Sequence, residues 1–473
     1  MNLPLAAIVC IASAACGASI FWHSWRGPLF ALFAYISISG FVSEKILGIR
    51  LGSIATDVVF VVPCYIALLL SIRKRRKFPG IPLTFLVLVI AFSFIVVLQI
   101  LNMHAQSATI LERIIGAKLW LLNIPLFFIG YFLFGNFGYL RKFFRLITCC
   151  AWLPCIIAIF QWAISLGYKP EEFITLLYPD LLAAKKASLP HLIFPGGTGA
   201  HSVKSTFLVP AQYSAFLINT LISISLHRTI ECNIRWTRFA DITLALVSAA
   251  AILTGSPELW FITPSVLICL ALSHRRYLPS LRSVHLALLT CLVLTIATFR
   301  LSQVTTATDN PAGAFLLLRE EESGMINLPP LNSPYLGTGT GSYSWLEIGN
   351  HQSIWHLSRL WSESYFEKAL KELGWVGLFL ILALIVYPIL VCSKCYYRLG
   401  PTEMKAFAGS LVVFFVLTAI GSFSSPYLDI EPNSLFFWTF LGMLFHINAY
   451  RTLRFGHVRC VKPTELLIQT PSS

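Results

Sequence analysis

The sequence predicts an all-α, polytopic membrane protein with about 12–13 transmembrane helices and a large outer loop that contains short helices. Hydrophobic residues make up 56% of the 473 residues and charged residues only 12%, whereas soluble globular chains carry about 25% charged residues. Apolar runs long enough to cross a bilayer about 30 Å thick recur along the whole chain. The runs show no period-two alternation, so they predict helices rather than barrel strands.

The apolar runs give the expected order of elements. The predicted spans are roughly 4–22, 28–44, 53–72, 80–101, 114–134, 146–166, 208–226, 239–254, 256–273, 284–299, 373–393, 406–424 and 433–449. The first run lacks a charged leading segment, which favours a retained span over a signal peptide. Four regions follow: an N-terminal transmembrane bundle 1–299 with an outer loop about 167–206, a large extracytoplasmic loop 300–372, C-terminal transmembrane helices 373–449, and a basic cytoplasmic tail 450–473.

Lysine and arginine set the predicted orientation, because cytoplasmic loops are enriched in both. The basic run Arg73–Lys77 predicts a cytoplasmic loop, and every second loop after it is basic, as is the tail. This alternation requires 239–273 to be two helices that meet at an outer turn near Pro257. Counting back from the basic run places the N-terminus outside, so two of the first three spans could instead form one re-entrant hairpin.

Composition excludes several other classes of protein. The net charge of +14 reflects the basic cytoplasmic loops, and no basic patch with interleaved aromatic residues lies in a soluble domain, so we expect no nucleic-acid partner. None of the twelve cysteines falls in the two large outer loops, so a disulfide framework is not expected. Those loops also lack a Walker-type phosphate loop, an HExxH motif and a nucleophile elbow, and we expect no metal and no cofactor.

The most informative polar segment runs from Arg319 to Gly377, between two predicted spans. Its three alternating glycines, Gly337, Gly339 and Gly341, fit a turn whose backbone amides can approach an anion. They fit a plain flexible turn equally well. A multi-spanning protein with one such loop is expected to do its work there.

A short amphipathic helix is expected from Glu363 to Leu373, with Ser362 as its N-terminal cap. Its apolar stripe is formed by Phe366, Ala369, Leu370 and Leu373. Glu367 and Lys371 have the spacing of a structural ion pair. Glu363 begins the helix, and it is either a carboxylate that favours the helix dipole or a base at the membrane surface.

Five motifs occur in the order of one known family between residues 190 and 447. They are Ser205–Pro210 followed by Ala215–Leu217, Leu253–Ser256, Arg319 with Pro334, Gly337, Gly339 and Gly341, Glu363-Ser364-x9-Gly374-xx-Gly377, and Phe436–Gly442. Together they resemble the O-antigen ligase/polymerase family of membrane glycosyltransferases. No single motif is specific, but five in this order carry more information than any one of them.

The chain departs from the pattern of this family at three positions. Glu363 stands where the ligases have histidine, as also occurs among polymerase-like members. Lys204 occupies the position at which the family has an arginine in the first loop. Pro257 occupies the position of the arginine that usually follows the turn 253–256 in the family. These departures favour a polymerase-like or other glycan-transferring member over the ligase subtype.

The resemblance implies transfer of a glycan from an undecaprenyl-diphosphate carrier to a saccharide or lipid-glycan acceptor, at the outer face of the bacterial cytoplasmic membrane. Arg319 and Lys204 would offset the charge that develops on the diphosphate, and Glu363 would accept the proton of the acceptor hydroxyl. The expected substrate contacts are Lys204, Gly337, Gly339, Gly341 and Ser364, with His201, His351 and His356 as reserve bases. The expected partners also include the lipid bilayer and proteins of envelope polysaccharide assembly.

Two other hypotheses stay open at this point. The chain could be a polysaccharide or lipid-linked sugar transporter, because Pro257 could mark a broken helix near the middle of the membrane. It could also be a non-catalytic family member with a scaffolding role, since one family arginine is missing. Polymer formation and single addition of a glycan are both compatible with the sequence.

Overall fold

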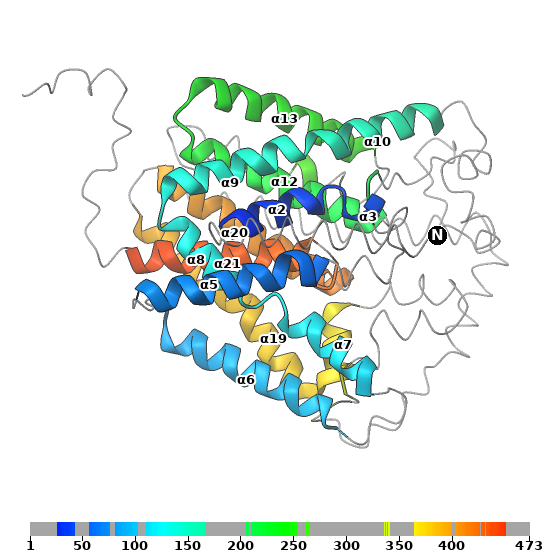
Figure 1. Ribbon diagram of the computed structural model, residues 1–473, viewed down its shortest axis with the longest axis vertical. Helices are drawn as coiled ribbons and strands as arrows, with labels where there is room; N and C mark the ends of the chain where they lie inside the picture. Colours follow the sequence, from blue (N-terminus) through cyan, green and yellow to red (C-terminus); the bar gives the residue numbers. More distant parts are fainter. Residues whose placement is uncertain are drawn as a thin grey trace, which may run out of the picture.

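The structure is a computed structural model that describes residues 26–42, 56–75, 81–102, 110–165, 205–207, 210–253, 259, 262–264, 266, 335, 337, 339–340, 364–399, 403–425, 427–430 and 432–450. Within these residues the chain is all-α, as predicted, and holds no strand. Figure 1 shows the helices side by side in one bundle.

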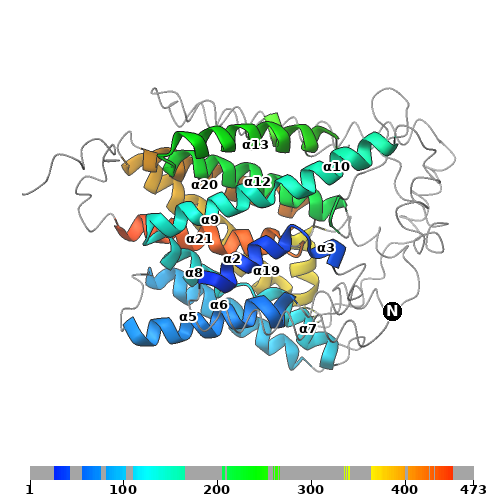
Figure 2. The same cartoon turned by 45° about the horizontal axis from the view of Figure 1, so that its top comes forward.

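The helices follow one another along the chain, and the connections whose residues are all described are short. They are α2 (Arg26–Ile36), α3 (Ser39–Val42), the π-helix η2 (Asp57–Val61), α5 (Val62–Arg75), α6 (Leu83–Ile100), α7 (Ile110–Leu121), α8 (Leu126–Phe134), α9 (Phe137–Cys150), α10 (Trp152–Ser165), α12 (Pro210–Ile230), α13 (Ile234–Leu253), α19 (Tyr365–Arg398), α20 (Glu403–Ser424) and α21 (Asn433–Tyr450). Figure 2 shows α21 in the middle of the bundle, with α12 and α13 on one side and α5 and α6 on the other.

Five helical stretches of the described part are long and apolar enough to cross a membrane. They are Leu83–Ile100, Arg113–Phe134, Phe137–Ala163, Tyr365–Arg398 and Met404–Phe423. A multi-pass architecture therefore fits the structure, while the total of 12–13 spans stays a prediction. The predicted spans 4–22 and 284–299, most of the loops 167–206 and 300–372, and the tail after residue 450 lie outside the described residues.

Two predicted spans differ from the helices that the structure describes. The span 114–134 is present as the stretch Arg113–Phe134, but a turn at 122–125, which contains Pro125, divides it into α7 and α8. The span 146–166 begins earlier, at the start of α9. There the side-chain oxygen of Asn136 accepts hydrogen bonds from the amides of Gly138 and Tyr139 (3.1 and 3.3 Å), so a polar cap starts the helix before the apolar run.

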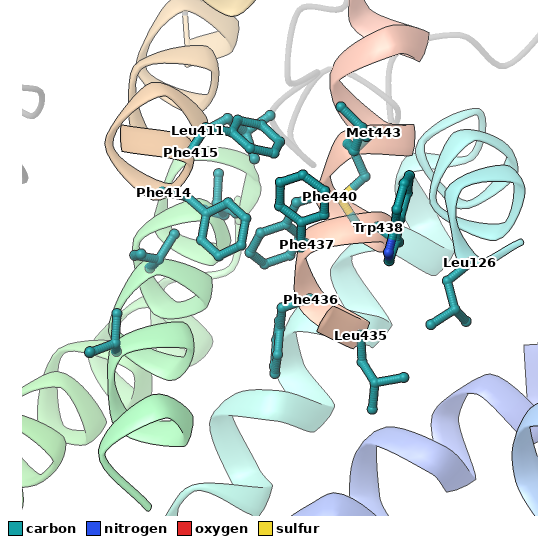
Figure 3. Packing of buried hydrophobic residues seen from close by; sticks show 14 of the residues in the cluster. Leu126, Leu411, Phe414, Phe415, Leu435, Phe436, Phe437, Trp438, Phe440 and Met443 are labelled. Atoms are coloured by element: carbon teal, nitrogen blue, oxygen red, sulfur yellow. The ribbon is translucent and has the colours of Figure 1, made fainter. Parts of the chain in front are cut away.

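The centre of the bundle is rich in phenylalanine, and α21 supplies much of it. Figure 3 shows Phe436, Phe437 and Phe440 of α21 beside Phe414 and Phe415 of α20. Phe414 and Phe440 meet edge to face, with ring centroids 4.9 Å apart. Aromatic rings favour this arrangement, so these contacts fix the separation of the two helices.

Glycines bring α21 into backbone contact with α8. A Cβ atom built at Gly442 would lie 1.9 Å from the carbonyl oxygen of Phe127, and one built at Gly130 would lie 1.9 Å from that of Thr439. Neither position has room for a side chain. Small residues allow this close approach between helices in membranes, which explains why the motif Phe436–Gly442 ends in glycine.

Many of the described arginine and lysine residues lie at one end of the bundle, which we call the basic end, whereas Arg113, Lys118, Lys368 and Lys371 lie elsewhere, on α7 and the first part of α19. Arg145 of α9 pairs with Glu231, which follows α12, and Arg228 of α12 pairs with Asp241 of α13. Ser225 of α12 lies 3.1 Å from Ser410 of α20, so α20 begins at the same end. Lys394 and Arg398 at the end of α19 and Lys405 at the start of α20 belong to it as well. We call the opposite end, where α19 begins, the glycine end.

Candidate functional site

The candidate site begins with a glycine contact at the glycine end. Gly337 and Gly374 both adopt positive φ, of 69° and 71°. A Cβ atom at Gly337 would lie 2.5 Å from the amide nitrogen of Gly374, and one at Gly374 would lie 2.4 Å from the carbonyl oxygen of Tyr335. Only glycine tolerates both the conformation and the close approach. Residues 335, 337 and 339 therefore pack directly on the backbone of α19, and together with Thr340 we call them the glycine segment.

A kink in α19 provides the surface for this contact. Gly374 departs from helical geometry and divides the helix into a first part, Tyr365–Leu373, and a long apolar part that follows. The amide of Gly339 donates to the carbonyl oxygen of Glu372 (3.1 Å), and the amide of Val376 donates to that of Tyr335 (3.4 Å). These bonds replace helical bonds that the kink removes. They explain the glycine at 374, while at Gly377 an added Cβ atom would lie 2.1 Å from the Cβ atom of Leu373.

The amide of Gly339 thus serves the fold, in addition to any role toward a ligand. The other side of the segment is held by Asn102, just after α6, and by α7. The Asn102 side chain donates to the carbonyl oxygen of Gly337 (3.4 Å), and the Thr340 hydroxyl donates to that of Arg113 (3.0 Å). The glycine segment is therefore fixed between α19 on one side and Asn102 and α7 on the other, which differs from a plain flexible turn.

A charged cluster lies under the first part of α19. Lys368 and Glu372 are one helical turn apart and are 5% and 0% exposed. Lys368 forms an ion pair with Asp429, in the turn between α20 and α21, and its ammonium nitrogen lies 4.9 Å from the ring centroid of Trp120. The indole N–H of Trp120 donates to a carboxylate oxygen of Glu372 (2.8 Å). Trp120 of α7 therefore contacts both Lys368 and Glu372 of α19.

The start of α19 is fixed by its own set of contacts. The Ser364 hydroxyl accepts a hydrogen bond from the amide of Glu367 (3.0 Å), so Ser364 is the N-cap. The amide of Tyr365 donates to the carbonyl oxygen of Ser425 (3.1 Å), and the Tyr365 ring lies 5.1 Å from that of Trp120. The helix begins two residues later than expected, and the cap is Ser364 rather than Ser362. Glu363 consequently precedes the cap in sequence.

The predicted ion pair of this helix is present. Lys371 lies 3.0 Å from Glu367, one turn away. The apolar stripe is also largely as expected, because Phe366, Ala369 and Leu373 are buried. The amphipathic pattern thus predicted the helix correctly, although three buried charged residues, Lys368, Lys371 and Glu372, lie beside the apolar stripe.

A second motif segment, Ser205–Phe207, is held at the glycine end, before α12 begins. Ser205 adopts a positive φ of 53°, which is unusual for a residue with a side chain. The Gln161 side chain of α10 accepts from its amide (2.9 Å) and donates to its carbonyl oxygen (3.3 Å), while the Ser205 hydroxyl donates to the Pro154 carbonyl oxygen (2.5 Å). The amide of Phe41 in α3 donates to the carbonyl oxygen of Thr206 (2.8 Å).

The structure thus accounts for part of the predicted site. Gly337, Gly339 and Ser364 lie at the glycine end, and the two glycines contact the kink of α19. The other predicted residues lie outside the described residues: Glu363, Arg319, Lys204, Gly341, His201, His351 and His356. The described part holds no group of three histidine, cysteine or acidic residues placed to bind a metal.

Sequence reasoning missed Trp120, Lys368, Glu372 and Asp429. A signal was present for two of them, because Lys368 and Glu372 are charged residues four apart in a helix that continues into an apolar span. No sequence signal pairs them with Trp120 or Asp429, which come from distant segments.

Comparison with known proteins adds no family assignment. The chain matches no protein-family model and no curated protein. The functional argument therefore depends on the residues and on their geometry.

Proposed function

We propose that this chain is a membrane glycosyltransferase that transfers or polymerises a glycan carried on a polyprenyl diphosphate, at the outer face of the cytoplasmic membrane of a bacterium. The observation that supports the proposal best is the contact of Gly337 and Gly339 with the kink of α19 at Gly374. These glycines belong to two separate motifs of the resemblance to the O-antigen ligase/polymerase family. Their contact makes the two motifs parts of one unit.

Other motif residues lie at the same end of the bundle. Ser205–Phe207 is fixed beside α10, and Lys204 precedes it directly in the sequence. Ser364 caps α19, and Glu363 precedes it directly. The glycine end is opposite the basic end, which the excess of lysine and arginine assigns to the cytoplasm. A lipid diphosphate on the outer leaflet would meet this end of the protein.

The expected chemistry needs two kinds of side chain. Cations must offset the negative charge that develops on the diphosphate as it leaves, and we assign this role to Arg319 and Lys204. A base must accept the proton of the attacking sugar hydroxyl, and we assign this role to Glu363. The fold would supply the placement, since correct orientation of reacting groups accounts for much of catalysis in group transfer.

The decisive experiment is transfer by the purified full-length protein, in lipid nanodiscs, with a lipid-linked oligosaccharide as donor. We expect Arg319→Ala and Glu363→Gln each to abolish transfer. Arg398→Ala, an exposed arginine at the basic end, and Glu367→Gln, one turn into α19, are matched controls that should retain it. If Glu363→Gln retained transfer, Glu363 would not be the base and would only interact favourably with the helix dipole. If the wild type showed no transfer, the proposal would be contradicted.

A transporter of lipid-linked sugar is the second candidate, and the interrupted helices favour it. Helices α7 and α8 are separated at residues 122–125, and α19 is kinked at Gly374. Transporters often use such discontinuous helices at their binding sites. Proteoliposomes distinguish the two candidates: a transporter moves the lipid-linked donor across the bilayer unchanged, whereas a transferase converts it into a longer glycan. A non-catalytic member would bind the donor and do neither.

A further inference from the structure

Buried charges at the start of α19 need an explanation beyond stability. Lys368 is 5% exposed and Glu372 is fully buried, in the part of the helix that precedes the apolar span. Taking charges out of water costs free energy, and buried ion pairs often stabilise a protein no better than apolar residues of the same volume. What a buried pair does provide is a single defined arrangement, because an unpaired charge in any alternative arrangement is strongly disfavoured.

The contacts of these charges join four parts of the molecule. Lys368 connects α19 to Asp429, in the turn between α20 and α21. Trp120 connects both Lys368 and Glu372 to α7, through its ring face and its N–H. The backbone of Glu372 connects α19 to the glycine segment, through the amide of Gly339. Each contact restricts where the first part of α19 can lie.

The first part of α19 also carries the elements of the proposed site. It begins at the cap Ser364, directly after Glu363, and ends at Gly374, where Gly337 packs. The α20–α21 turn contacts it twice, through Asp429 and through the carbonyl oxygen of Ser425. A shift of this short helix would therefore move the helix start and the glycine contact together.

We propose that Lys368 and Asp429 are positioning residues for the glycan transfer reaction: their ion pair over Trp120 holds the first part of α19 in the place that the reaction requires. The inference depends on the proposed function, which assigns the reaction to this end of the bundle. Neither residue contacts the reacting atoms in this proposal. They act through the position of α19.

The test neutralises the pair as a whole, so that neither Lys368 nor Asp429 is left charged without the other. The double variant Lys368→Met with Asp429→Asn, the glycine-end variant, is compared with the double variant Arg145→Met with Glu231→Gln, the basic-end variant. The second pair is a matched control, because it also joins a helix (α9) to a residue outside the helices (Glu231) and also lies beside a tryptophan, with the Arg145 guanidinium 4.7 Å from the ring centroid of Trp236. Both variants are made in the full chain and assayed with a lipid-linked oligosaccharide.

We expect the glycine-end variant to lower kcat at least about tenfold while KM for the donor changes little, since small displacements of reacting groups mainly slow the chemical step. The basic-end variant should keep kcat near the wild-type value even if its unfolding temperature falls. A wild-type kcat in the glycine-end variant would overturn the proposal. An equal loss of kcat in both variants would overturn it too, because it would indicate a general effect on stability.

Hydrogen exchange tests the positioning role without any activity. In the full-length protein, the amides of residues 364–373 should exchange faster in the glycine-end variant than in the wild type. In the basic-end variant, their exchange rates should equal those of the wild type. Unchanged exchange in the glycine-end variant would contradict the positioning role. If the wild type transfers no glycan, the proposed function fails, and the exchange measurement still decides whether the ion pair fixes the start of α19.

Discussion

The two ends of the bundle use the same chemical device in different settings. At the basic end, Arg145 forms two hydrogen bonds with Glu231 (2.8 and 2.9 Å) beside Trp236. At the glycine end, Lys368 pairs with Asp429 beside Trp120. The basic-end pair joins α9, a regular helix, to Glu231, which follows α12 directly. The glycine-end pair joins α19, a kinked helix, to the turn between α20 and α21. The backbone of Glu372, one turn after Lys368, binds the glycine segment, so the surroundings of the glycine-end pair are more irregular.

Backbone conformation separates the two ends even more clearly. Within the described residues, those with positive φ are Ser205, Gly337, Gly339 and Gly374, and all of them lie at the glycine end. Unusual backbone conformations tend to cluster at functional sites, where the surrounding structure must hold them. The comparison therefore indicates that the basic end has regular backbone geometry, whereas the glycine end has the unusual backbone conformations that are typical of functional sites.

The largest effect is expected for Gly374→Ala. Its Cβ atom would lie 2.4 Å from the Tyr335 carbonyl oxygen, at a φ of 71°. We expect the free energy of unfolding to fall by at least about 3 kcal/mol, and transfer to be lost. The matched change at the basic end is Gly138→Ala, where the added atom meets only the Asn136 side chain, and it should be close to neutral. Unfolding temperatures in detergent and transfer assays would check both; normal transfer in Gly374→Ala would remove the glycine contact from the site.

The next effect concerns the pH dependence of the basic end. Burial alone would raise the pKa of Glu231, but hydrogen bonds from Arg145, the Asn233 amide and His227 lower it from 4.5 to about 2. The ionised carboxylate therefore stabilises the fold above a pH of about 4.5, and this stabilisation is lost as the pH falls towards 2. It amounts to about 3 kcal/mol.

Glu231→Gln checks this assignment. The difference in unfolding temperature between the variant and the wild type should be largest near neutral pH and should shrink as the pH falls below 4.5. Transfer at neutral pH should persist in the folded variant, because the residue lies at the basic end. A difference that does not depend on pH would show that the charge of Glu231 is not what stabilises this end.

A smaller effect is expected at Ser205. Ser205→Ala removes the hydrogen bond to Pro154 and keeps the unfavourable φ of 53°, so it should cost about 1–2 kcal/mol. Ser205→Gly also removes the hydrogen bond but relieves the backbone, so it should cost less. Thermal unfolding of the two variants orders them directly. A more stable alanine variant would mean that backbone strain at this position is negligible.

The smallest effect is expected for Glu367→Gln. The carboxylate is 42% exposed and pairs only along its own helix, with Lys371. Pairs of this kind contribute about 0.2–0.5 kcal/mol. The unfolding temperature and the transfer activity should both stay close to those of the wild type. If Glu367→Gln abolished transfer, as is expected for Glu363→Gln, the role of the base would belong to Glu367, one helical turn later.

Within the described residues, the apolar runs correctly predicted helices, for a physical reason. An apolar run in a membrane protein has few alternatives to a helix, because backbone groups must form hydrogen bonds internally. Helix ends depend instead on single polar groups. The cap at Asn136 starts α9 ahead of its apolar run, and the break at Pro125 divides a run that hydropathy reads as continuous.

The candidate site was harder to predict, because its contacts join distant segments. The requirement for glycine at Gly374 depends on Gly337, and the burial of Lys368 depends on Trp120 and Asp429. A pattern along one helix correctly gave the Glu367–Lys371 pair, which is local. It could not identify charges whose partners lie on other helices.

The contact between α8 and α21 has a consequence for biosynthesis. Gly130 and Gly442 bring the two backbones together, yet α8 leaves the ribosome early and α21 is the last helix that the structure describes. The surface of α8 that Gly130 leaves open for α21 must therefore wait, uncovered by its final partner, while hundreds of residues are made. Chains that stop before Asn433 should keep this surface exposed, and we expect membrane quality-control proteases to remove them faster than the full chain.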